Sequence, residues 1–157
     1  MAHVPRVYAE TSVFGGVFDE EFKRASTAFF DTVQRDRFRL VTSRAVESEL
    51  RDAPIRVQAF FSDALAYTEL VEVTPEAALL RDAYLAAGIV GPASRVDALH
   101  IALATVNACL IVVSWNFKHI VHYQKIPRYN AINVARGYTP LLIHSPAEVI
   151  LDEGQDV

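Results

Sequence analysis

Three acidic side chains and one amide are placed where they could share a metal ion. Glu10 directly follows a first strand-like run, and Glu49 falls in the helix-like segment after the second such run. Asp97 lies in the first turn of a long apolar helix, and Asn116 lies just past the end of the fourth strand-like run. Because the carboxyl ends of parallel strands meet at one edge of a sheet, we expect these groups to converge there.

Clustered carboxylates repel one another, and without a counter-ion some of them would stay protonated. A bound Mg²⁺ or Mn²⁺ removes this conflict, since both are hard cations that favour oxygen ligands. Such a cation could lower the pKa of a bound water and stabilise charge on a phosphoryl oxygen. We therefore predict that the metal site and the catalytic site are formed by the same residues: Glu10, Glu49, Asp97 and Asn116.

Some of these residues also have a structural alternative. Asp97 fits the acid of a helix capping box, and Asn116 could simply stabilise a turn. Glu49 competes with two other acids of its helix, Glu47 and Asp52, and its spacing from the start of that helix favours it.

Neighbouring polar residues could support the site. Hydroxyl groups beside the expected ligands could hydrogen-bond them, or could only satisfy local backbone groups: Thr11, Ser12 and Ser114. Three basic side chains could contact substrate, although a histidine in the middle of an apolar helix more often packs against its neighbours: His100, Lys118 and His119.

Strand-like and helix-like segments alternate along the chain, without repeats or linkers. Parallel strands with helical crossovers predict a three-layer α/β/α sandwich around a central, mainly parallel sheet, in a single domain spanning residues 1–157. The expected strands are Arg6–Ala9, Phe38–Val41, Glu69–Val73, Leu110–Val113 and Leu141–Ile143. The expected helices run over 22–33, 43–54, 55–65, 75–88, 98–106 and, in parts, 120–137, and a last one begins at 145.

Capping and breaking residues set several of these boundaries. Gly15-Gly16 predicts a turn, and Pro127 is expected to break the helical segment around it. Thr74 followed by proline predicts a helix start. Two capping boxes are expected, at Ser94–Asp97 and Ser145–Glu148.

The composition is that of a globular protein, with 52% hydrophobic and 22% charged residues among 157. The longest apolar run, Ala108–Val113, is too short to span a membrane, and the first residues do not resemble a signal peptide. The single cysteine, Cys109, excludes a multi-cysteine zinc site. We expect a cytoplasmic protein without a membrane partner.

The net charge of −4 gives mild evidence against a nucleic-acid partner, because phosphate contacts need lysine and arginine. Carboxylates gathered for a metal add negative charge of their own, however. Six arginines between Arg35 and Arg56 could form a basic patch or a solvated surface. The chain has no phosphate-binding loop, no dinucleotide fingerprint and no nucleophile elbow.

Four segments in order resemble the successive motifs of PIN domains, over nearly the whole chain. The resemblance is greatest to toxins of the VapC type and their close relatives. Its residues are Tyr8-Ala9-Glu10-Thr11-Ser12, Ser43 with Glu49-Leu50, Asp97-Ala98-Leu99-His100-Ile101-Ala102 and Ser114-Trp115-Asn116-Phe117.

The resemblance implies a divalent-metal ribonuclease whose acids bind Mg²⁺ or Mn²⁺ and orient water for cleavage of RNA. It also implies a homodimer and, for the toxin branch, inhibition by a cognate antitoxin protein. Two residues depart from the family pattern, which usually has aspartate at both positions: Glu10 is one methylene longer, and Asn116 is neutral. The alternatives are a catalytically silent PIN fold that binds RNA or protein, and a phosphate-ester hydrolase acting on small molecules.

Overall fold

Two interior strands of the sheet are apolar on both faces, as strands covered by helices on both sides must be. In the computed structural model, which describes residues 4–150, they are β1 (Arg6–Ala9) and β4 (Ile111–Val113). Val7, Tyr8 and Ala9 are completely buried. The ends of the expected 1–157 domain, residues 1–3 and 151–157, lie outside the described residues.

The sheet has five strands in the order β3-β2-β1-β4-β5, and all four pairings are parallel. The remaining strands are β2 (Arg39–Ser43), β3 (Thr68–Val71) and β5 (Leu142–His144). The chain builds outward from β1 to β3, then crosses to the other side of β1 to add β4 and β5. The order therefore reverses between β1 and β4, the place where open parallel sheets bind ligands.

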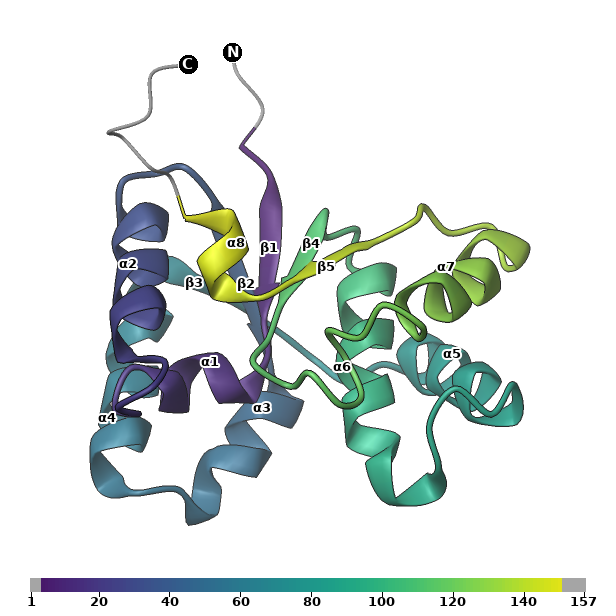
Figure 1. Ribbon diagram of the computed structural model, residues 1–157, viewed down its shortest axis with the longest axis horizontal. Coiled ribbons are helices and arrows are strands. Elements are labelled where there is room, and N and C mark those ends of the chain that lie inside the picture. The colour runs from purple at the N-terminus through teal and green to yellow at the C-terminus, as the bar shows by residue number, and fades with distance from the viewer. Residues whose placement is uncertain (1–3, 151–157) are drawn as a thin grey trace.

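Helices cover both faces of this sheet, which confirms the predicted three-layer sandwich (Figure 1). One group of helices lies on the left in Figure 1: α1 (Thr11–Gly16), α2 (Lys23–Gln34), α3 (Arg44–Glu49) and α4 (Ile55–Ala64). The other lies on the right: α5 (Pro75–Ala86), α6 (Arg95–Val106) and α7 (Ile126–Ala135). The short α8 (Pro146–Val149) packs on α2. Among residues 4–150, no helix combines the length and the apolar character needed to cross a bilayer.

Most expected elements form within a few residues of their predicted bounds, but the predictions at Gly15-Gly16 and at Pro127 were wrong. Gly15 and Gly16 do not form a turn but end α1. Pro127 does not break a helix; it lies in the first turn of α7, where its missing N–H has no partner to lose. Pro54 does end the preceding helical segment, as expected, and begins α4.

Most of helix α6 is apolar, and the rest of the protein covers it on nearly every side. Every residue from Ala98 to Thr105 is buried, as expected for a helix that packs between the sheet and other helices rather than at the surface. The two polar side chains near its start, Asp97 and His100, are thereby carried into the protein at the edge where β1 and β4 end.

A buried polar network joins the helices on the right of Figure 1. Asn133 of α7 is fully buried and accepts a short hydrogen bond from the Tyr84 hydroxyl of α5. Its amide nitrogen donates to Thr105 Oγ1 at 3.2 Å and to Asn130 Oδ1 at 3.3 Å. The Asn130 side chain in turn donates to the Leu141 carbonyl and accepts the Leu141 backbone N–H. This network fixes α5, α6 and α7 to one another and to the segment that leads into β5.

Candidate functional site

The carboxyl ends of β1 and β4 meet at the reversal point of the sheet. The backbone N–H of Glu10 donates to the Val113 carbonyl at 3.1 Å, so the residue after β1 is hydrogen-bonded to the end of β4. Glu10 lies in extended conformation and precedes α1. This geometry directs its side chain to the edge at which Ser114 and Asn116 follow β4.

Two serine hydroxyl groups hold the Glu10 carboxylate. One serine follows β1 and the other follows β4. Ser12 Oγ and Ser114 Oγ both donate to Oε1 of Glu10, each at 2.6 Å. The same hydroxyl oxygens accept backbone N–H groups, Ser12 from Trp115 and Ser114 from Asn116, both at 2.9 Å. The carboxylate, only 5% exposed, is thus fixed by residues that are themselves fixed.

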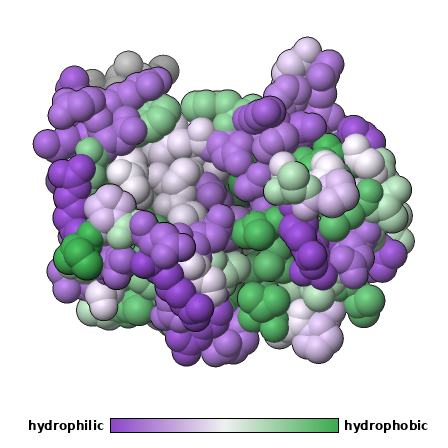
Figure 2. Space-filling model, turned by 90° about the horizontal axis from the view of Figure 1, so that it is seen from below, coloured by the Kyte–Doolittle hydropathy of each residue, from purple (hydrophilic) through white to green (hydrophobic). Residues whose placement is uncertain are grey.

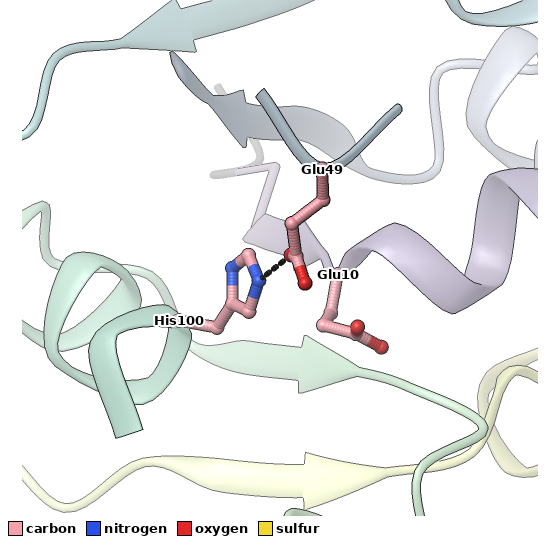
Figure 3. Close-up of side chains that lie close together, drawn as sticks. All are labelled: Glu10, Glu49 and His100. Carbon is pink, nitrogen blue, oxygen red and sulfur yellow. Dashed lines mark hydrogen bonds and ion pairs between the residues drawn. The ribbon is translucent and has the colours of Figure 1, made fainter. Parts of the chain in front are cut away.

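Glu49 approaches the same space from the end of α3 (Figure 3). Its Oε1 accepts hydrogen bonds from Thr11 Oγ1 and from His100 Nε2, each at 2.5 Å. Partial burial opposes ionisation of this carboxyl, but the hydrogen bonds from His100 and Thr11 outweigh it and hold the pKa of Glu49 below its usual value. Glu49 is therefore ionised throughout the neutral range.

Ligand atoms of Glu10, Glu49 and His100 lie within 4.8 Å of one another. Oε1 of each carboxylate already accepts two hydrogen bonds, and no described residue donates to either Oε2. Two ionised carboxylates at this distance repel unless a cation lies between them. The site therefore fits a hard divalent cation, with Glu10 and Glu49 each able to offer one oxygen.

Asp97 lacks the capping role that its position in the sequence allowed. Ser94 ends a short 3-10 turn (η3, Pro92–Ser94) and makes no side-chain cap, so the predicted Ser94–Asp97 capping box was wrong. By contrast, the Ser145–Glu148 box forms. No described residue donates a hydrogen bond to the Asp97 carboxyl. Burial, and after it the negative charge of Glu10, raise the pKa of Asp97 above its ordinary value.

Asn116 lies beside the acids, but its side-chain oxygen is engaged. Oδ1 accepts the backbone N–H groups of Lys118 at 3.2 Å and His119 at 2.9 Å. Its backbone carbonyl also accepts from Ile120 and Val121. This geometry matches the turn-stabilising alternative, and it fixes the loop that leaves β4.

The three residues considered for substrate contact occupy different environments. His100 is completely buried with both ring nitrogens hydrogen-bonded, which leaves it no surface to offer a substrate and matches the packing alternative. Lys118 is exposed just beyond Asn116. His119 is partly buried, and its Nδ1 has no hydrogen-bond partner among the described residues.

The single tryptophan of the chain, Trp115, lies between Ser114 and Asn116 in the loop that follows β4. Its ring stacks on Phe22 with centroids 4.2 Å apart, and its Nε1 donates to Ser26 Oγ at 2.8 Å. Gly16 lies directly against it: a Cβ there would come within 2.5 Å of Ser26 Oγ and 2.8 Å of Trp115 Nε1. Glycine is needed at this position for close approach, not for an unusual backbone angle.

We expect Gly16→Ala to destabilise the fold by about 1–3 kcal/mol, because the stacked indole must move to admit a methyl group. Gly15→Ala is the matched control: a Cβ at Gly15 meets nothing within 4 Å, so alanine should instead stabilise α1 by roughly 0.5–1 kcal/mol. Urea unfolding followed by tryptophan fluorescence measures both. Equal effects of the same sign would contradict the close-packing argument.

Figure 2 shows the molecule from the side on which β1 ends. Hydrophilic side chains cover much of this face, and hydrophobic ones gather right of centre, on the side of α5 and α6. The face is therefore neither uniformly hydrophilic nor uniformly apolar.

Sequence reasoning did not identify Tyr8 and Ser43 as parts of the site. Both are completely buried, and the Tyr8 hydroxyl lies 2.7 Å from both Ser43 Oγ and His100 Nδ1. A polar tip in an otherwise apolar interior strand is the signal that could have pointed to them, because a buried hydroxyl requires a partner.

No family model and no curated protein sequence matches the chain. Solved structures do match. VapBC2 of Rickettsia felis, bound to a promoter DNA fragment, aligns with a TM-score of 0.59 at 12% identity, over 89% of this chain and 98% of that one. VapC20 of Mycobacterium tuberculosis, described as a sarcin-ricin loop cleaving toxin, aligns with a TM-score of 0.58 at 14% identity, over 86% and 98%.

A DNA-bound VapBC of Salmonella typhimurium aligns with a TM-score of 0.55 at 17% identity, over 90% of this chain and 98% of the other. These identities are too low to carry a function, but the alignments span nearly the whole length of the toxin folds. With its all-parallel five-stranded sheet between two helical layers, the chain has the PIN fold of the VapC toxins.

Proposed function

We propose that the protein is a divalent-metal-dependent endoribonuclease that hydrolyses RNA phosphodiester bonds. The observation that supports this most is the pair of carboxylates, Glu10 and Glu49, each with one oxygen held by two donors and the other left over. This pair lies where the strand order of the sheet reverses. The chain shares this fold with a toxin described as cleaving the sarcin-ricin loop.

In this proposal Glu10, Glu49 and Asp97 hold Mg²⁺ or Mn²⁺, and a bound cation would supply Lewis acidity and an acidified water. Ser12, Ser114 and Thr11 fix the orientation of the carboxylates. Asp97, whose pKa is raised and whose carboxyl has no hydrogen-bond donor, gains most from a cation. Lys118 and His119 are proposed to contact the phosphate backbone beside Asn116.

The test is cleavage of a mixed RNA pool with Mg²⁺, with Mn²⁺ and with chelator, comparing the wild type with Glu10→Gln purified in the same way. Glutamine keeps an acceptor for Ser12 and Ser114 but removes the charge. Cleavage by the wild type that requires metal and is lost in the variant supports the proposal. Equal cleavage by both proteins would indicate a contaminating nuclease and count against it.

A second candidate function is a catalytically silent fold that binds RNA or protein. The observation in its favour is that Oδ1 of Asn116 already accepts two backbone N–H groups, so the fourth expected ligand, a neutral amide, has its oxygen engaged elsewhere. RNA binding without metal-dependent cleavage under any of these conditions would select this alternative.

Asn116→Asp should strengthen Mn²⁺ binding. A carboxylate can keep both turn hydrogen bonds with one oxygen and add a charge-bearing second oxygen, so we expect a gain on the order of 1–3 kcal/mol if that oxygen reaches the ion. Calorimetric Mn²⁺ titration, paired with an RNA cleavage rate, measures the effect. Unchanged affinity and rate in a wild type that cleaves RNA would show that residue 116 serves only the turn.

We also propose that the protein is the toxin of a toxin–antitoxin pair and is inhibited by a small partner protein, as the VapBC complexes suggest. Induced expression should then arrest growth of a bacterial host, and co-expression of a small open reading frame adjoining the gene should relieve the arrest. Arrest that persists in Glu10→Gln would argue against a nuclease toxin.

We expect a homodimer in solution. Several large apolar side chains remain exposed on the described surface, among them Ile55, Leu79 and Val134, and burying such residues is a common source of self-association. Light scattering at micromolar concentration should give twice the monomer mass of 17.4 kDa. A mass equal to the monomer would contradict this expectation.

A further inference from the structure

A buried chain of hydrogen bonds runs from Glu49 to the opposite end of the same helix. Glu49 Oε1 lies 2.5 Å from His100 Nε2, and His100 Nδ1 lies 2.7 Å from the Tyr8 hydroxyl. That hydroxyl lies 2.7 Å from Ser43 Oγ, which accepts the backbone N–H of Val46 at 3.3 Å. Three elements besides α3 contribute, and the Tyr8, Ser43 and His100 side chains are fully buried.

The carboxylate end of this chain sets the direction of its hydrogens when the imidazole is neutral. An ionised carboxylate can only accept, so the hydrogen of His100 lies on Nε2 and points at Glu49. The bare Nδ1 then accepts from the Tyr8 hydroxyl, and the Tyr8 oxygen can accept from Ser43. The reverse order would place a bare ring nitrogen 2.5 Å from a carboxylate oxygen, two acceptors without a hydrogen between them.

We infer that His100 is a positioning residue, fixed in its Nε2–H tautomer by Tyr8 and Ser43, which holds Oε1 of Glu49 and leaves Oε2 to face the cation. This role rests on the metal-dependent function proposed above. The inference separates His100 from the ligands, although its ring lies within the same 4.8 Å cluster. Nε2 carries a hydrogen and has no lone pair left for a metal, and the lone pair of Nδ1 accepts the hydrogen bond from Tyr8.

The assignment decides which metals the site prefers. With His100 outside the coordination sphere, the ligands are oxygen atoms, which suit Mg²⁺ and Mn²⁺; an imidazole ligand would instead favour zinc and iron. The chain also ties both ends of α3 to one tyrosine–histidine pair, Ser43 at its start and Glu49 at its end. The carboxylate is thereby kept in place before any cation binds.

The tautomer is measured directly by ¹⁵N NMR of the imidazole rings in metal-free protein. The chain has five histidines, and the His100 signals are assigned by their loss in His100→Gln. We expect a hydrogen on Nε2 and a bare Nδ1. A hydrogen on Nδ1, with or without one on Nε2, would overturn the inference, and this result is independent of any nuclease activity.

The positioning role is tested by Mn²⁺ affinity, followed by electron paramagnetic resonance, in Tyr8→Phe, Glu49→Gln and the double variant. Tyr8→Phe removes only the hydroxyl that fixes the ring and should weaken Mn²⁺ binding about tenfold. In the Glu49→Gln background the same change should have no further effect, because it acts through Glu49. Equal losses in both backgrounds would overturn the role.

Two further variants separate positioning from packing. Tyr84→Phe removes the hydroxyl of another fully buried tyrosine, which bonds Asn133 and none of the acids, and should leave Mn²⁺ affinity unchanged. His100→Gln keeps an N–H donor for Glu49 and should bind Mn²⁺ more tightly than His100→Leu. Loss of affinity in Tyr84→Phe, or identical affinities for the two His100 variants, would refute the positioning role.

The proposed function and this inference fail in different ways. A wild type that binds Mn²⁺ but cleaves no RNA would refute the nuclease proposal and leave the positioning role standing. A wild type that binds no Mn²⁺ would overturn both the function and the role of His100 in it, while the tautomer measured without metal would still report the direction of the hydrogen bonds.

Discussion

Asp97→Asn is expected to raise the thermal stability of the metal-free protein at neutral pH while it reduces RNA cleavage by at least about 100-fold. Burial and the Glu10 charge raise the pKa of Asp97, so its ionised form is less favourable in the folded chain than in the unfolded chain. The stabilising contribution of a group with a raised pKa is present in acid and is lost as the pH rises through the folded-state pKa. The neutral amide removes that cost.

The stability difference between Asp97→Asn and the wild type should therefore shrink as the pH falls into the acid range, because the wild-type carboxyl also becomes neutral there. Glu49 acts in the opposite sense in both proteins: its pKa is lowered, so its contribution is present at neutral pH and is lost in acid. Because both proteins contain Glu49, its effect cancels in the difference.

With Mn²⁺ bound, the wild type should become more stable than Asp97→Asn. A ligand that binds only the folded state stabilises it by about 2.7 kcal/mol at a concentration 100 times its dissociation constant. The wild type should gain this and Asp97→Asn should gain much less. Melting temperatures with and without Mn²⁺ measure the crossing, and Asp63→Asn, at an exposed position of α4, is the control. A variant that is less stable than the wild type in chelator at neutral pH would show that Asp97 has a structural role.

Asn133→Ala is expected to lower the free energy of unfolding by about 2–4 kcal/mol, the largest stability loss that we predict. The change removes the acceptor of the buried Tyr84 hydroxyl and one donor to the Thr105 hydroxyl, and leaves a small cavity between α5, α6 and α7. Urea unfolding measures it. RNA cleavage per folded molecule should be unchanged, because no residue of the network belongs to the acidic site.

A double variant distinguishes a lost hydrogen bond from lost packing. Asn133→Leu alone leaves the Tyr84 hydroxyl without an acceptor, whereas Asn133→Leu combined with Tyr84→Phe removes both partners together. Replacing both members of a buried pair by apolar groups of similar shape is close to neutral, so the double variant should recover part of the stability. A double variant less stable than Asn133→Leu would show that packing volume, not hydrogen bonding, dominates there.

The parts of the fold that could be predicted from the sequence are those governed by local patterns. The continuous apolar run before Ser114 predicted an interior parallel strand, and alternation with helices predicted the layers. The positions of Glu10, Glu49 and Asp97 at one edge then follow from parallel topology alone. Whether these three bind metal remains a prediction.

Other features depend on contacts between distant residues and leave no local pattern. The hydrogen bonds of His100 join positions 51 and 92 residues away in sequence, so nothing around it distinguishes positioning from packing. The sequence suggested that Gly16 is a turn residue. Glycine is needed there instead because Trp115, which lies almost a hundred positions later, packs directly against it. At Ser94, the preceding 3-10 turn runs directly into α6, so a serine three residues before an acid did not become a cap.

The reversal of strand order between β1 and β4 has a consequence for protein synthesis. The ribosome makes Glu10 104 residues before Ser114, which holds it and which follows β4. Pairing of strands so far apart in sequence is slow, because a long loop must close before the contact forms. A nascent or prematurely ended chain therefore carries the acids without the hydroxyl that orients Glu10. Under the proposed function, the site stays incomplete until Ser114 has been made and β4 has paired with β1.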